Sequence, residues 1–141
     1  MMSEIVEIEE QIVEEFEIFG DEWEGKYEHL IDLGKSLPKI EDKYKTENNI
    51  IQGCQSKVWL HSEMKDGKIW FTADSDAIIT KGMVALMNRV LNEHTPDEII
   101  NAKLLFIDKI GLKEHLSPTR ANGLVSMINR MKMDAVSLKE I

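Results

Sequence analysis

The N-terminal part of the chain has apolar positions at helical spacing and acidic positions between them. The apolar side chains are Ile5, Ile8, Ile12, Phe16 and Phe19, and glutamates stand at positions 4, 7, 10, 14 and 15. A stripe with this spacing predicts an amphipathic helix over 3–19, capped by Ser3 and ended by Gly20. A second helix is expected over 22–33, ending before Gly34, and a polar loop follows to position 49.

The pattern changes to a period of two in the middle of the chain. Val58, Leu60, Ser62 and Met64 alternate with Lys57, Trp59, His61 and Glu63. Alternation of this kind predicts a strand with two distinct faces. Asp66-Gly67 is a hairpin turn signal, and Ile69, Phe71 and Ala73 continue one face of the returning strand. A short strand at Ile50-Ile51 would complete a three-stranded antiparallel meander.

The last half of the chain returns to helical spacing. Asp74-Ser75 is expected to cap a helix that carries apolar positions from 79 to 91. Thr95-Pro96-Asp97-Glu98 has the form of a capping box, and residues 103–116 are interpreted as short helices. Ser117-Pro118 begins a final helix, and the last eight residues are expected to fray. The order of elements predicts one α+β domain over 1–141.

Composition and charge exclude several classes of function. The 141 residues are 43% hydrophobic, which suffices for one domain with a core, and the formal net charge is −9. An acidic surface disfavours nucleic acids and anionic membranes as partners. No apolar run approaches the roughly 18 residues of a membrane span. The acidic start resembles neither a secretory nor a transit signal, so we expect a cytoplasmic protein.

Cys54 is the only cysteine in the chain. One thiol excludes an internal disulfide, a resolving cysteine in the same chain and a metal site built on several thiolates. The four histidines, at positions 29, 61, 94 and 115, have no metal-binding spacing. The sequence therefore predicts neither a metal site nor a cofactor.

The surroundings of Cys54 leave two interpretations open. The residue could be a small buried hydrophobe, or it could be a reactive thiol on a mobile loop tip. Gly53 gives the loop conformational freedom, and Gln55 supplies hydrogen-bonding groups instead of apolar cover. A hydrolytic cysteine enzyme needs a histidine base, and nothing nearby is marked to orient His61 for that role. A sulfur acceptor needs only one accessible thiol.

Four blocks of sequence resemble the SufE-like sulfur acceptors, which partner cysteine desulfurases in iron–sulfur cluster assembly. They are LIDLGKSLP (30–38), IIQGCQSKVWL (50–60), DSDAIITKGMVAL (74–86) and LSPTRANGLVSM (116–127). The blocks stand in family order, and the resemblance runs from about residue 22 to residue 131. It implies a SufE/NifU-like fold of N-terminal helices, a three-stranded meander and C-terminal helices.

The resemblance also implies a function and a site. Cys54 would accept persulfide sulfur from a SufS-type or related cysteine desulfurase, stimulate that enzyme, and deliver the sulfur to a scaffold complex such as SufBCD. The chain would thus be an acceptor and activator without a cofactor of its own, and not an enzyme. Asp76 and Arg120 match family positions near the cysteine loop, where Gly53 would let the loop move and Gln55 could steady it.

Two other functions remain open at this point. In the first, the chain is a docking module that regulates a desulfurase allosterically, and Cys54 is not essential. In the second, it is a stand-alone thiol enzyme. Asp76 could equally stabilise a helix as an acidic residue in its first turn, where it interacts with the helix dipole, and Arg120 could equally form a structural ion pair.

Overall fold

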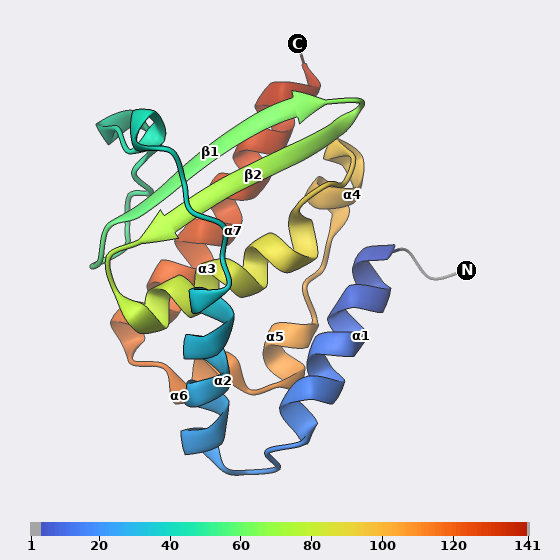
Figure 1. Ribbon diagram of the computed structural model, residues 1–141. Helices are drawn as coiled ribbons and strands as arrows, with labels where there is room; N and C mark the ends of the chain where they lie inside the picture. Colours follow the sequence, from blue (N-terminus) through green and yellow to red (C-terminus); the bar gives the residue numbers. More distant parts are fainter. Residues whose placement is uncertain (1–3, 141) are drawn as a thin grey trace.

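The computed structural model describes residues 4–140 (Figure 1). Its elements are α1 (Glu4–Glu17), α2 (Trp23–Lys35), the 3₁₀ turns η1 (Asp42–Tyr44) and η2 (Glu47–Asn49), β1 (Val58–Lys65), β2 (Lys68–Ser75), α3 (Ile78–Leu91), α4 (Pro96–Asn101), α5 (Phe106–Lys109), α6 (Leu112–His115) and α7 (Pro118–Lys139). The mixed helix and sheet composition is the one that the sequence predicts. The predicted cap Ser3 lies outside the described residues.

The period-two segment forms the antiparallel hairpin β1–β2, with Val58 opposite Ser75 and Lys65 opposite Lys68. Asp66 and Gly67 connect the strands with φ of 54° and 78°. Positive φ at both central residues gives the turn the twist of the strands it joins. The hairpin buries one face, formed by Val58, Leu60, Ile69, Phe71 and Ala73. The predicted alternation is confirmed.

The predicted third strand is wrong. Ile50 makes one isolated bridge to Trp59, and the Ile51 N–H donates to the Val58 carbonyl at 2.9 Å. Only two residues separate η2 from the turn that begins at Gln52, so no longer ladder can form. Within residues 4–140 the sheet therefore has two strands.

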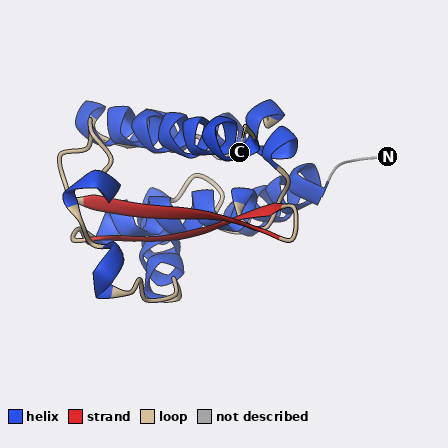
Figure 2. Cartoon of the chain, turned by 90° about the horizontal axis from the view of Figure 1, so that it is seen from above, coloured by secondary structure: helices blue, strands red, loops and turns tan. Residues whose placement is uncertain are grey.

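Helices α3 and α7 cover the buried face of the hairpin. The cavity at their junction is lined by Val58, Leu60 and Ala73 of the hairpin, Val84 and Met87 of α3, and Met127 and Met131 of α7. Figure 2 shows α7 as a long rod along one side of the hairpin, running roughly parallel to the strands. The loop before β1 consequently lies beside α7.

Helices α2 and α3 cross at two glycines. A Cβ on Gly82 would lie 2.3 Å from the Leu30 carbonyl oxygen, and a Cβ on Gly34 would lie 2.9 Å from the Gly82 nitrogen. Only glycine permits this approach. The helix α2 continues through Gly34 to Lys35, two residues beyond its predicted end. Gly34 serves as a contact point in the crossing, because the neighbouring backbone replaces its side chain.

The first helix buries Ile5, Ile12 and Phe16 of its predicted stripe almost fully, whereas Ile8 is only partly buried. The helix ends at Glu17, two residues before its predicted end, and Phe19 lies in the turn that follows.

Helix α1 packs on α3 and α5. Glu15 also joins it to α3 and α2 by side-chain contacts. The Arg89 guanidinium of α3 holds both carboxylate oxygens of Glu15, and the His29 ring of α2 lies 3.1 Å from Oε1. The acidic face of α1 is therefore partly engaged in tertiary contacts.

Two further predictions concern the C-terminal half. The capping box of α4 is confirmed, because the Thr95 hydroxyl accepts from the Glu98 N–H and the Glu98 carboxylate accepts from the Thr95 N–H. The predicted fraying of the last eight residues is wrong for positions 134–139. Helix α7 continues to Lys139, because Ala135 is fully buried against the core.

Candidate functional site

The candidate site lies in the loop between Ile51 and Val58. Gly53 has a φ of +91°, in the left-handed region where side chains are strained, and a Cβ there would lie 2.4 Å from the Ser126 Oγ of α7. The glycine thus serves two purposes. It makes the turn, and it lets the loop approach the helix closely enough to place Cys54 on it.

The Cys54 side chain rests on α7. Its Sγ lies 3.6 Å from the carbonyl oxygen of Gly123, and a Cβ on that glycine would be in ordinary van der Waals contact with the thiol. Cys54 is half-buried and packs against the hydrophobic core. The sequence leaves the burial of the thiol open, and in the structure α7 supplies the partial cover that neighbouring residues lack. This burial raises the pKa of the Cys54 thiol, because removing water disfavours the thiolate.

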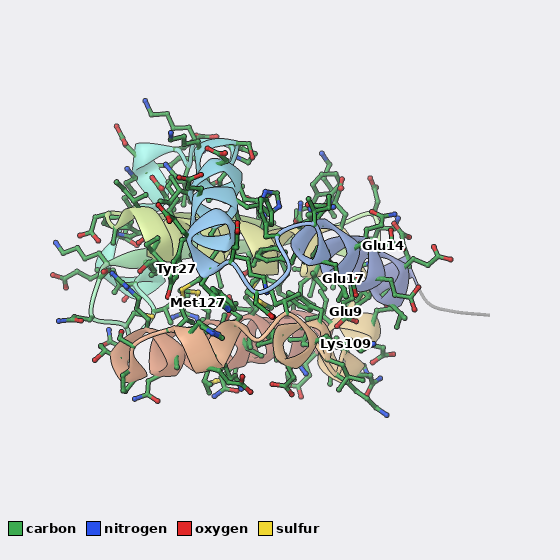
Figure 3. All side chains as sticks on the ribbon, turned by 90° about the horizontal axis from the view of Figure 1, so that it is seen from below. Glu9, Glu14, Glu17, Tyr27, Lys109 and Met127 are labelled. Carbon is green, nitrogen blue, oxygen red and sulfur yellow. The ribbon has the colours of Figure 1, made fainter. Side chains whose placement is uncertain are left out.

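A small cavity of about 70 Å³ opens beside the thiol. It is lined by Cys54, Gln55, Ser56, Thr80, Met83, Thr119, Arg120, Gly123 and Met127. Figure 3 shows Met127 on α7, on the side that faces the other helices. Among the residues that the structure describes, Arg120 is the only charged one in this lining. An anion formed at the sulfur would thus have one cation within its own cavity.

Arg120 lies in the first turn of α7. Its backbone N–H donates to the Oγ of Ser117 at 3.3 Å, and Ser117 is the N-cap of the helix. The side chain is exposed, and it forms no ion pair or hydrogen bond with any other residue in 4–140. The structure therefore places Arg120 beside Cys54 without a structural partner for its charge.

Asp76 holds the other end of the loop. Its Oδ1 accepts from the Lys57 N–H at 3.0 Å, and its own N–H donates to the Lys57 carbonyl at 3.2 Å. The residue does not lie in a helical turn as predicted, and Asp74-Ser75 does not cap a helix. Ser75 is the last residue of β2, and α3 begins only at Ile78. The strand extends this far because Ser75 pairs with Val58 and donates to the Lys57 carbonyl.

Gln55 is exposed and contributes to the cavity wall, with no hydrogen bond from its side chain to another described residue. Sequence reasoning missed Thr119 and Gly123, although both lie in the block that begins at Leu116. A glycine inside a helical pattern is the signal that could have identified Gly123 as a point of close approach.

None of the four histidines lines this cavity. His61 lies on the outward face of β1, where its Nε2 is 2.7 Å from Glu63 Oε1 and its ring stacks on Tyr44. Among the described residues, no group of three histidine, cysteine or acidic side chains could hold a metal ion. No helix within 4–140 has the length and apolar character needed to cross a bilayer.

The fold and the site define a class: a small α+β protein whose single thiol rests half-buried on a long C-terminal helix. The family model described as "SufE: Fe-S metabolism associated domain" matches residues 10–135. A SufE-like protein of Rhizobium meliloti (strain 1021) is 44% identical over 131 residues, covering 89% of this chain and 93% of that relative. The chain therefore belongs to the SufE family, which associates it with Fe–S metabolism.

A solved structure has the same fold. The solution structure of a hypothetical protein from Thermus thermophilus is similar with a TM-score of 0.78. The similarity covers 95% of this chain and 97% of that one, at 19% sequence identity. At that identity the likeness establishes the architecture alone.

Proposed function

We propose that this protein accepts sulfur on Cys54 from the persulfide of a cysteine desulfurase and passes it to an iron–sulfur scaffold complex in the cytoplasm. The observation that carries the proposal is the position of the only thiol, in a cavity that opens to solvent and contains one unpaired cation, Arg120. Membership in the SufE family supports the same assignment.

The transfer is a thiol–persulfide exchange. The Cys54 sulfur attacks the outer sulfur of the partner's persulfide, and a new S–S bond forms on Cys54. The S–S bond in the partner breaks, and its electron pair stays on the partner's thiolate. The proton that Cys54 loses balances the charge, and no net oxidation or reduction takes place. Stimulation of the desulfurase follows because its persulfide is removed.

The surroundings of Cys54 suit a carrier that is idle until it meets its partner. Burial raises the pKa of the thiol, so at neutral pH the resting sulfur is mostly protonated. A protonated thiol oxidises slowly, which limits stray loss of the site. Arg120 would stabilise the persulfide anion after transfer, because an opposite charge favours the ionised form.

One observation favours a second function. The same half-burial of Cys54 also suits a docking module that regulates the desulfurase without taking up sulfur, because a covered thiol is a weak nucleophile at rest. Asp76 would then belong to the docking surface. The two functions differ in whether sulfur leaves the desulfurase on this chain.

Intact-mass measurement separates the two. The protein is mixed with a SufS-type desulfurase, pyridoxal phosphate and cysteine, and its mass is recorded without reductant. One added sulfur on the parent and none on Cys54→Ser supports the acceptor. Full stimulation of the desulfurase by both proteins, with no added sulfur on either, supports the regulator. Turnover of a small substrate by this chain alone would identify an enzyme instead.

A further inference from the structure

Besides Ser126, four residues of α7 line or bind the segment 48–62. Gly123, Met127, Arg130 and Asp134 are separated by four, three and four residues, which places them on one stripe of the helix. We call these four residues the α7 stripe. Gly123 receives the Cys54 thiol, and Met127 lines its cavity. The other two members of the stripe are polar and hold the segment by hydrogen bonds.

Arg130 binds two backbone carbonyls that precede the cysteine. Its Nη2 donates to the Asn48 oxygen at 2.9 Å, and its Nη1 donates to the Ile50 oxygen at 3.4 Å. Its Nε donates to Asp134 Oδ1 at 3.2 Å, and Asp134 Oδ2 accepts from the Ser62 hydroxyl at 2.7 Å. The guanidinium is half-buried, and its planar fork reaches three acceptors at once.

These contacts fix the beginning of the cysteine loop. Ile50 stands four residues before Cys54, and the Ile51 N–H closes the loop on Val58 at 2.9 Å. Arg130 stands seven positions after Gly123, which corresponds to about 10 Å along the helix. A loop anchored at that distance has little freedom to shift along α7. The depth at which the thiol rests on Gly123 therefore depends on the anchor at Arg130.

We propose that Arg130 is a positioning residue of the Cys54 site: by holding the Asn48 and Ile50 carbonyls on α7, it keeps the thiol against Gly123 and restrains its reactivity. The functional meaning of this restraint rests on the proposed function of Cys54. The restraint itself is a property of the isolated chain. Its test therefore needs no desulfurase.

The competing explanation is that Arg130 only stabilises the fold. Lys132 offers a matched control, because it lies on the same helix, is also half-buried, and donates to a backbone carbonyl, that of Ala102, at 2.5 Å. That carbonyl belongs to the segment after α4, and Lys132 does not line the thiol cavity. Arg130→Ala and Lys132→Ala each remove a cationic side chain of α7 that donates to backbone carbonyl oxygen. Only the first removes the anchor of the cysteine loop.

The experiment measures the rate at which iodoacetamide alkylates Cys54 from neutral to alkaline pH. Losing the anchor raises the open population of the loop, so Arg130→Ala should react about two- to tenfold faster at neutral pH. The pH at which the alkylation rate of Arg130→Ala is half its maximum should fall toward the value for an ordinary thiol, because the sulfur is better hydrated when the loop is open. Of the described residues that line the cavity, only Arg120 is charged, and all three proteins retain it.

Three outcomes decide the matter. Faster alkylation and a lower midpoint in Arg130→Ala, with Lys132→Ala close to the parent, support the positioning role. Equal acceleration in both variants would overturn it, since that reports general loosening, and so would a rate unchanged in Arg130→Ala. Should Arg130→Ala not fold, Arg130→Lys is measured in its place. Lysine keeps the ion pair with Asp134 but cannot bind both carbonyl oxygens. An alkylation rate equal to that of the parent protein then refutes the proposal.

The result is independent of sulfur transfer. If the parent protein takes up no sulfur from a desulfurase, the proposed function is refuted. The alkylation difference between Arg130→Ala and Lys132→Ala still tests the positioning role. A parent that takes up sulfur normally, with no alkylation difference between the variants, would end the positioning role alone.

Discussion

The thiol of Cys54 lies 3.6 Å from the carbonyl oxygen of Gly123, although 69 positions separate the two residues in the chain. A Cβ on Gly123 would lie 3.6 Å from Sγ and 3.9 Å from the Cys54 Cα, which is ordinary van der Waals contact. The space between the helix and the loop at position 123 thus accommodates a methyl group but not a larger side chain.

Gly123→Ala should stabilise the protein. Alanine suits a helix interior better than glycine by about 0.5–1 kcal/mol, and the new methyl finds room beside Cys54. We expect the Tm to rise by about 1–4 °C and alkylation of the thiol to slow. Gly123→Leu should do the reverse, because its longer side chain must displace Cys54. A lower Tm for the alanine variant would contradict the contact distances.

Cys54→Ser should fold and bind the desulfurase but accept no sulfur. The serine hydroxyl can donate to the Gly123 carbonyl, so the loss of stability should stay near 1 kcal/mol, about the size of one altered hydrogen bond. Serine cannot carry a persulfide, so uptake of sulfur should vanish. Thermal melting, a binding titration and intact mass measure the three properties. Much lower thermal stability would mean that Cys54 is chiefly a core residue.

Arg120→Ala should lower sulfur transfer without lowering stability. The side chain is exposed and unpaired within the described residues, so the Tm should change by no more than about 2 °C. Under the proposed function Arg120 stabilises the anionic sulfur by a charge-assisted hydrogen bond, and losing that bond should slow transfer by roughly tenfold or more. Arg120→Lys, which keeps the charge, should be intermediate. Transfer at the parent's rate in the alanine variant would leave Arg120 without a functional role.

Asp76→Arg should loosen the end of the cysteine loop and alter stimulation or binding of the desulfurase. It removes the acceptor of the Lys57 N–H, so exchange of that amide should accelerate by about tenfold. Asp76→Asn keeps an oxygen acceptor and serves as the control. Hydrogen exchange reports the loop, and activity titration reports the partner. A change in exchange without any change in either titration would assign Asp76 to the loop alone.

Glu15→Gln should destabilise the protein at neutral pH and not in acid. The hydrogen bonds from Arg89 hold the pKa of the Glu15 carboxyl below its usual range. A group with a lowered folded-state pKa contributes stability above its unfolded value, near about 4.3, and loses it as the pH falls through the folded value. The pair is partly solvated, so we expect a difference of about 1 kcal/mol at pH 7. Urea unfolding of both proteins across the acid range measures it.

The sequence by itself determined the local elements, because their causes are local. Alternation placed the buried face of the hairpin, the Asp66-Gly67 pair set its turn, and the Thr95–Glu98 box began α4. The single thiol and the four blocks around it were enough to identify the family. These features depend on neighbours within a few residues, and periodicity records such neighbours directly.

The tertiary structure alone decided the cover of Cys54, the length of α2 and the position of Asp76. Each depends on a contact between segments distant in the chain: Gly123 beneath the thiol, Gly82 against the Leu30 carbonyl, and Asp76 on the Lys57 backbone. The same holds for Arg130, whose side chain looks in the sequence like one more exposed cation on a helix. Its acceptors are main-chain carbonyls, which every residue carries, so no residue type in the sequence marks them.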